Sequence, residues 1–153
     1  MRRRLLRVVL APVVLPHELA HAVPAWLGGL DPQIAVFPEW EGEAVPLGQF
    51  DAVVSESTPS WLIRLVAVAP LPTFLGIAAG LGPAMPANRP ETLAFIALLS
   101  WWASLSEGDL SVALAPAAVR AAGEFRAPST PLAKSAPLVV VATVAAVSWL
   151  LLS

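Results

Sequence analysis

The chain has 153 residues, of which 57% are hydrophobic and only 13% are charged, and its mean hydropathy is +0.72. A soluble domain carries about a quarter charged residues, so this composition favours an integral membrane protein whose apolar surface faces the lipid bilayer. The net charge of -2 gives no electrostatic basis for binding nucleic acid, and the absence of cysteine excludes disulfides and thiolate metal ligands.

Residues 5–27 form the first predicted membrane-spanning segment. Four arginines lie among the first seven residues, which favours a cytoplasmic N-terminus for a protein of the cell membrane. A basic start, an apolar run and the tripeptide Ala20-His21-Ala22 also match the outline of a signal peptide. We prefer a membrane span, because the apolar character continues to Leu27 and makes the segment long enough to cross a bilayer. Of its three prolines, Pro16 can open a new helix at His17, and Pro24 is expected to kink the segment because it removes a hydrogen bond to the carbonyl of Ala20.

This segment contains the pattern His17-Glu18-Leu19-Ala20-His21. On a helix, residues four apart lie on one face, so both imidazoles can reach a single metal ion while Glu18 projects beside them. Zn²⁺ binds neutral imidazole readily, and the pattern therefore predicts two zinc ligands and a general base. The chain has only two histidines, so this spacing is improbable by chance. The alternative is that both are structural polar residues of a helix face.

Residues 31–58 form a polar insertion between the first and second apolar segments. Short β-like runs at 33–37, 44–50 and 52–54 predict a small hairpin or sheet at the membrane face. Glu39, Glu41 and Glu43 alternate along the intervening turn, which is more typical of a solvated edge than of a metal site.

Three further apolar segments follow, at 61–85, 91–122 and 136–152. Pro70 and Pro72 predict a kink in the second segment, and the polar residues 106–109 predict a break in the third. We therefore expect one membrane-embedded domain over residues 1–153. Its fold class is all-α, with about four transmembrane helices, some of them kinked at proline, and a small β-insertion between the first and second.

A third metal ligand is sought among the few acidic residues in or beside the apolar segments. Glu107 and Asp109 are the candidates, since ionisable groups at such positions are costly and are functional by default. Counted along their segments, they lie at about the depth of the two histidines, at about 1.5 Å per helical residue. We prefer Asp109 and keep Glu107 as the alternative. Ser106 and Asp109 also fit a local helix-capping pattern, which competes with the ligand interpretation.

These features together resemble the site-2 protease class of intramembrane zinc metalloproteases. The resemblance covers roughly residues 8–114, from the His-Glu-Leu-Ala-His pattern through the β-like insertion to the acidic residues of the third segment. In that family the aspartate stands in an Asp-Gly pair within a longer motif containing Asn-Pro. This chain has Gly108 before Asp109 instead, and its one asparagine, Asn88, lies in the preceding link.

The resemblance implies a membrane-embedded zinc endopeptidase that hydrolyses a membrane protein or peptide substrate. Zn²⁺ held by His17, His21 and Asp109 would activate water, and Glu18 would accept its proton. Pairing with a strand near 33–37 is one way to hold the substrate extended. The alternatives are a catalytically inactive metal-binding membrane protein and a non-enzymatic polytopic membrane protein. The sequence leaves the substrate and the oligomeric state open.

Overall fold

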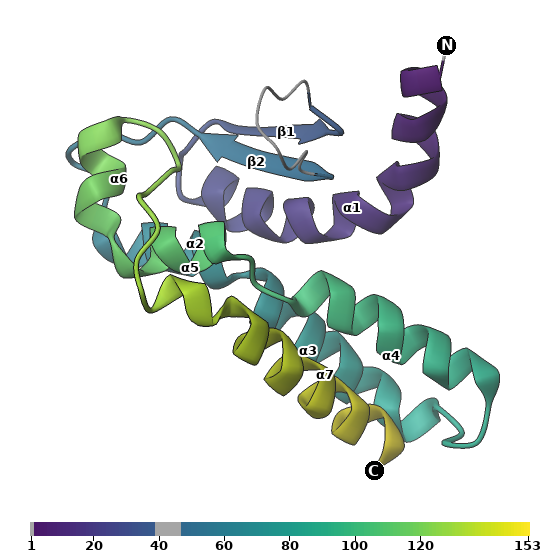
Figure 1. Ribbon diagram of the computed structural model, residues 1–153. Coiled ribbons are helices and arrows are strands. Elements are labelled where there is room, and N and C mark those ends of the chain that lie inside the picture. Colours follow the sequence, from purple (N-terminus) through teal and green to yellow (C-terminus); the bar gives the residue numbers. More distant parts are fainter. Residues whose placement is uncertain (1, 39–46) are drawn as a thin grey trace.

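The computed structural model describes residues 2–38 and 47–153, and these form a largely helical protein with one small sheet (Figure 1). In chain order the elements are α1 (Arg2–Leu27), β1 (Pro32–Val36), β2 (Gly48–Ala52), α2 (Ser60–Val68), α3 (Pro70–Leu81), η1 (Gly82–Ala84), α4 (Pro90–Ala103), α5 (Glu107–Leu114), α6 (Pro116–Ala122), η2 (Ala133–Ser135) and α7 (Ala136–Leu152).

Helix α1 carries the His-Glu-Leu-Ala-His pattern and bends in its first half, where its opening turns run at an angle to the rest (Figure 1). Pro12 lies in that half and Pro16 just beyond it, and each lacks the N–H that would bond the carbonyl four residues earlier. The helix ends at Leu27, and Gly29 in the following turn has a φ of +78°, a left-handed conformation that glycine adopts without strain. The first segment is therefore one bent helix that continues through Pro16, where a new helix could have begun, and through Pro24.

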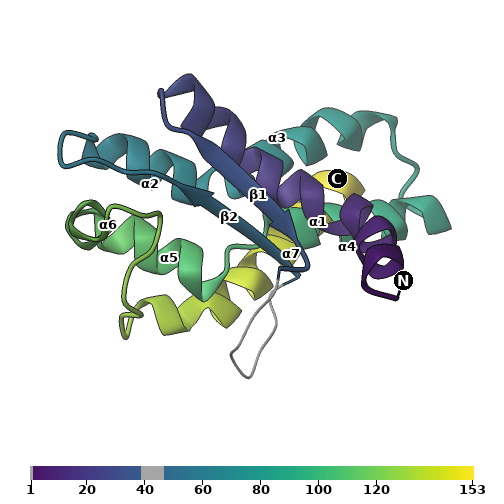
Figure 2. The same ribbon diagram turned by 90° about the horizontal axis from the view of Figure 1, so that it is seen from above.

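The β-insertion is a two-stranded antiparallel sheet that packs on α1 (Figure 2). Its register pairs Ile34 with Phe50. The first strand lies within one residue of the expected 33–37. The second strand, expected at 44–50, is at Gly48–Ala52, and Val53 forms an isolated bridge with Glu124 rather than a third strand. The acidic turn with Glu39, Glu41 and Glu43 lies outside the described residues.

The expectation of four membrane-spanning helices is wrong. Within the described residues, two stretches are long and apolar enough to cross a membrane, Val8–Leu27 and Ala133–Leu152. There is a third such stretch only if α2 and the following Pro70–Ala84 act together as one broken span. These two segments are bent by 49° at their junction. This bend falls at the kink expected from Pro70.

The predicted third span, 91–122, is divided into three short helices. Helix α4 has 14 residues, so it is about 21 Å long, against about 30 Å for the hydrocarbon core of a bilayer. The chain leaves the helical conformation at Ser104, Ser106 caps α5, and Pro116 begins α6. Capping side chains and proline interrupt a segment that hydropathy alone treats as continuous.

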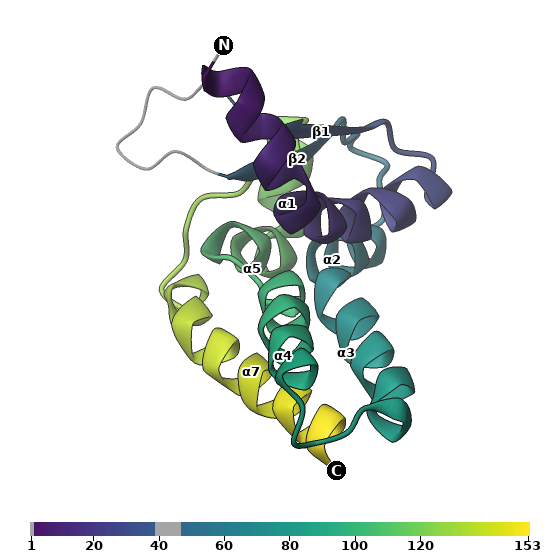
Figure 3. The same ribbon diagram turned by 90° about the vertical axis from the view of Figure 1, so that its right-hand side faces the viewer.

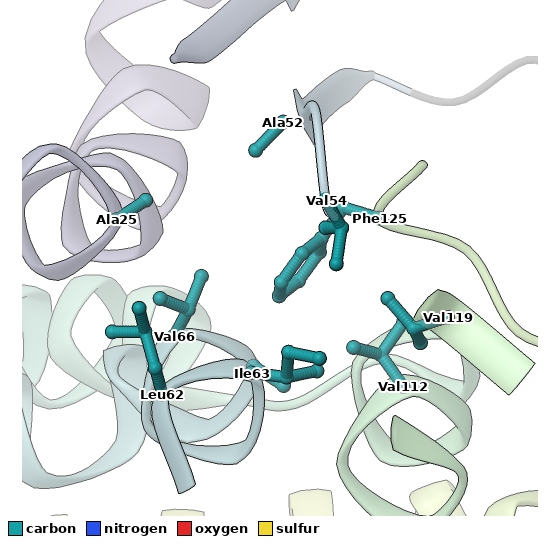
Figure 4. Packing of buried hydrophobic residues seen from close by; sticks show 10 residues of the cluster. Ala25, Ala52, Val54, Leu62, Ile63, Val66, Val112, Val119 and Phe125 are labelled. Atoms are coloured by element: carbon teal, nitrogen blue, oxygen red, sulfur yellow. The ribbon is translucent and has the colours of Figure 1, made fainter. Parts of the chain in front are cut away.

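Two buried apolar clusters hold these elements together. The first joins α1, β2, α2, α5 and α6, and Figure 4 shows its side chains converging between these elements. The second joins α1 to α3, α4 and α7, three helices that run side by side (Figure 3). Helix α1 belongs to both clusters, through Ala25 in the first and Ala20 in the second. The second half of α1 is therefore fixed between the two clusters.

Candidate metal centre

The structure brings together His17, His21 and Asp109. The two imidazoles lie one turn apart on α1, and their Nε2 atoms are 3.2 Å from each other. Asp109, in the first turn of α5, lies with Oδ1 3.3 Å from His21 Nε2 and with Oδ2 3.8 Å from His17 Nε2. One ligand atom from each of the three residues lies within 4.8 Å of the others, so the group can hold a metal ion.

The Nδ1 atoms of both histidines are hydrogen-bonded to backbone carbonyls. His17 Nδ1 lies 2.9 Å from the carbonyl oxygen of Trp102, and His21 Nδ1 lies 2.7 Å from that of Val66. A carbonyl oxygen only accepts, so each Nδ1 carries the proton and donates it. In the neutral rings, both Nε2 atoms are then left with a lone pair that faces the other ring and the Asp109 carboxylate.

Three facing acceptors are unfavourable unless a cation or a shared proton lies between them. The donor set of two imidazole nitrogens and one carboxylate is one that Zn²⁺ takes in catalytic sites. With zinc–ligand bonds of about 2.0–2.1 Å, neighbouring ligand atoms of a tetrahedral site are about 3.3 Å apart. The 3.2 Å between the two Nε2 atoms and the 3.3 Å between Asp109 Oδ1 and His21 Nε2 match this value, and the other carboxylate oxygen, Oδ2, lies 3.8 Å from His17 Nε2. The residues therefore fit a zinc ion.

Asp109 also takes part in the cap of its own helix, so the ligand interpretation and the capping interpretation of this residue are compatible. Its Oδ2 accepts hydrogen bonds from the backbone N–H of Ser106 at 2.7 Å and from the Ser106 hydroxyl at 2.8 Å. In return the Asp109 backbone N–H donates to Ser106 Oγ at 3.1 Å, which completes a capping box. The cap fixes the carboxylate through Oδ2 and leaves Oδ1 directed at His21.

Glu107, the alternative third ligand, is directed elsewhere. Its side chain is exposed and accepts a hydrogen bond from the hydroxyl of Ser129, in the link before α7. It is not part of the group formed by His17, His21 and Asp109. One residue of helix is about 100° of rotation at 3.6 residues per turn, so Glu107 and Asp109 leave α5 on different faces.

Glu18 lies at the wall of the cavity beside the imidazoles. Only 8% of its surface is exposed, and within the described part of the chain no hydrogen-bond donor contacts its carboxylate. The cavity, of about 410 Å³, is also lined by His17, Asp109 and Gly48. A second, more apolar cavity of about 240 Å³ adjoins Glu18 and His17 on the side of Trp101 and Val140. A buried carboxylate with open space on two sides is available to a water molecule or a substrate.

Gly48, at the start of β2, makes this arrangement possible. A Cβ atom added at this position would overlap Glu18 Oε1 and Val14 Cγ1. The strand therefore passes α1 at a distance that only glycine permits. Phe50, two residues along β2, places its ring 5.4 Å from that of His21 and 5.0 Å from that of Phe125. The sheet thus forms the wall of the cavity as well as covering α1.

Sequence reasoning missed the groups that orient the imidazoles. The carbonyls of Trp102 and Val66 are backbone atoms, so no residue type marks them in the sequence. The Trp102 indole also donates to the carbonyl of Val13, one turn before His17, at 2.8 Å. A tryptophan near the end of a helix was the available signal, but it equally fits a membrane-interface residue.

Comparisons with protein-family models, curated proteins and solved structures found no match to this chain. Its function is therefore inferred from the arrangement of its own residues.

Proposed function

We propose that this chain is a membrane-embedded zinc endopeptidase of the kind that the site-2 protease class comprises. Its metal would be held by His17, His21 and Asp109. The observation that carries the proposal is the direction of the two imidazoles. Their Nδ1–H groups are bonded to carbonyls, so both Nε2 lone pairs meet beside a carboxylate. Metal-binding histidines commonly donate the second ring nitrogen in this way, because the bond fixes both tautomer and ring orientation.

A bound Zn²⁺ would supply Lewis-acid chemistry, lowering the pKa of water and polarising a peptide carbonyl. Glu18 is the residue that would accept the proton of the attacking water and pass it to the leaving amine. Its carboxylate lines the same cavity as His17 and Asp109, and it has no competing hydrogen bond within the described residues. Burial beside Val14 and Gly48 shields it from bulk water, which strengthens its electrostatic effect on a substrate.

The substrate would be an extended peptide segment lying along β2. Gly48, Gln49 and Phe50 line the cavity, whereas β1 lies on the other side of β2 and does not. The opposite edge of β2 is approached near its end, through the isolated Val53–Glu124 bridge and the hydrogen bond from the Phe125 N–H to Asp51 Oδ1, and no strand pairs with it in the part of the chain that the structure describes. An edge strand of this kind can pair with an added strand. We therefore propose Gly48–Ala52, rather than the strand near 33–37, as the strand that would hold the substrate.

Two measurements on the full chain in detergent or lipid test the proposal. We expect purified protein to bind one zinc ion per chain and to cleave transmembrane or extended peptide substrates. Glu18→Gln should keep the zinc and abolish cleavage, since the amide cannot accept the proton. Zinc without cleavage of any substrate would indicate the inactive metal-binding protein. Absence of zinc binding, or undiminished cleavage by Glu18→Gln, would contradict the proposal.

A further inference from the structure

The carbonyl that orients His21 lies in a helix that is interrupted four residues later. Val66 is in the last turn of α2, and in a continuous helix its carbonyl would accept a hydrogen bond from the N–H of residue 70. Residue 70 is proline, which has no N–H. The regular hydrogen bond to Val66 is therefore absent, and His21 Nδ1 lies 2.7 Å from this oxygen instead.

The surrounding geometry supports this exchange of partners. The other backbone group at the Val66 oxygen is the N–H of Ala69, at a long 3.4 Å. Helices α2 and α3 bend by 49° at the junction, which turns the end of α2 away from the axis of α3. Pro70 itself is buried in the interior, so its ring is held in place. Kinks of this type release carbonyls that other polar groups then satisfy.

We propose that Pro70 is a positioning residue for the metal centre: by withholding a backbone N–H from Val66, it frees the carbonyl that fixes the ring of His21. This inference rests on the proposed zinc site and adds to it a residue that touches neither metal nor substrate. It explains why a proline stands within a broken apolar helix next to His21. The bend supplies a strong acceptor inside the protein, where an unpaired carbonyl would otherwise cost free energy.

The test compares Pro70→Ala with Pro72→Ala. Alanine at 70 restores an N–H that competes with His21 for Val66. Alanine at 72 restores an N–H whose partner is the carbonyl of Val68, which within the described residues makes no hydrogen bond to the candidate metal centre. Pro72 is exposed, which makes its substitution the milder control for loss of a proline in the same helix. We expect Pro70→Ala to weaken zinc binding by about 10–100-fold, as for other changes to groups that orient a ligand, and Pro72→Ala to leave it unchanged.

Nitrogen-15 NMR of the imidazole rings supplies a readout that general destabilisation does not move. With only two histidines in the chain, each ring gives its own signals. In Pro70→Ala the Nδ1–H signal of His21 should shift towards that of a weaker hydrogen bond, while His17, which donates to Trp102, keeps its signal. The same measurement without zinc separates the orientation of the ring from metal binding.

Unchanged His21 signals and zinc affinity in Pro70→Ala would overturn the inference while leaving the zinc site intact. Equal changes in both proline variants would also overturn it, because the effect would then belong to the helix as a whole. Failure of the wild-type protein to bind zinc would contradict the proposed function, and the ring signals of metal-free protein would still test the role of Pro70.

Discussion

Asp109 Oδ1 lies 3.3 Å from His21 Nε2, and this contact joins the first turn of α5 to the middle of α1. The other carboxylate oxygen is held by Ser106, so the carboxylate cannot turn freely. One residue therefore serves both as a helix cap and as the candidate third ligand. The capping box restricts Asp109 to one orientation, which reduces the entropy that is lost when a ligand is fixed.

The choice between the two acidic residues is tested by their amides. Asp109→Asn retains a side-chain oxygen for the cap but loses the negative charge that a cation attracts. We expect its zinc affinity to fall by more than about tenfold. Loss of a group that only orients a ligand already lowers metal affinity by about that factor, and loss of a ligand charge should lower it further. Glu107→Gln should bind zinc as the wild type does, because Glu107 contacts Ser129 and not the imidazoles. Zinc titration of the metal-free variants measures both; a reversed order would make Glu107 the ligand.

Removal of the cap should affect both stability and metal binding. Ser106→Ala eliminates two hydrogen bonds to Asp109, and loss of an N-cap costs about 1 kcal/mol of unfolding free energy. Only the backbone N–H of residue 106 would then hold the Asp109 carboxylate, and this weaker restraint should also lower zinc affinity by about 10–100-fold. Ser135→Ala is the matched control, since the Ser135 hydroxyl bonds the carbonyl of Leu132 at an exposed turn. Chemical denaturation and zinc titration would follow the two effects; intact zinc affinity in Ser106→Ala would separate the cap from the site.

The fold was predictable where one local rule decides the outcome. The first and last spans follow from long apolar stretches, and the bend at Pro70 follows from a missing N–H. The prediction of a third span was wrong because hydropathy is averaged over a window of residues. The helix is instead interrupted at single positions, by Ser104, Ser106 and Pro116. Packing of α4 against α3, α7 and α1 stabilises this short helix.

The side chains of the candidate site could be predicted from the sequence, but the groups that orient these side chains could not. The spacing of His17 and His21 places two rings on one face, and the scarcity of acidic residues restricts the third group to Glu107 or Asp109. The choice between these two depends on the direction in which α5 leaves its cap, which is a tertiary feature. The carbonyls of Val66 and Trp102 and the close approach of Gly48 depend on how separate elements meet. No single residue type encodes them.

The close approach of β2 to α1 predicts a variant that separates chemistry from metal binding. In Gly48→Ala the new Cβ would overlap the Glu18 carboxylate and Val14, so either the strand or Glu18 must move. We expect peptide cleavage to fall by about tenfold or more, since a displaced general base loses part of a contribution of about 10²–10⁴. Zinc content should stay that of the wild type, because the atoms nearest to the added Cβ belong to Glu18 and Val14 and not to a candidate ligand.

Gly76→Ala is the control for this experiment. Gly76 lies in α3, and a Cβ added there meets no atom within 4 Å. It should leave both cleavage and zinc content unchanged. Wild-type cleavage by Gly48→Ala would mean that the position of Glu18 against β2 has no part in the reaction. Loss of zinc from Gly48→Ala would instead make the sheet a support for the histidines.

Zinc removal should loosen the connection between α1 and α5. The three candidate ligands come from these two helices, so a bound ion links them and stabilises only the folded state. A ligand present at 100 times its Kd stabilises by about 2.7 kcal/mol, and a chelator removes that contribution. We expect a lower unfolding temperature for wild-type protein in chelator and recovery on addition of zinc. His21→Ala should unfold at one temperature with or without chelator, because its site is already lost. An equal chelator effect on His21→Ala would mean that the stabilising ion binds elsewhere in the chain.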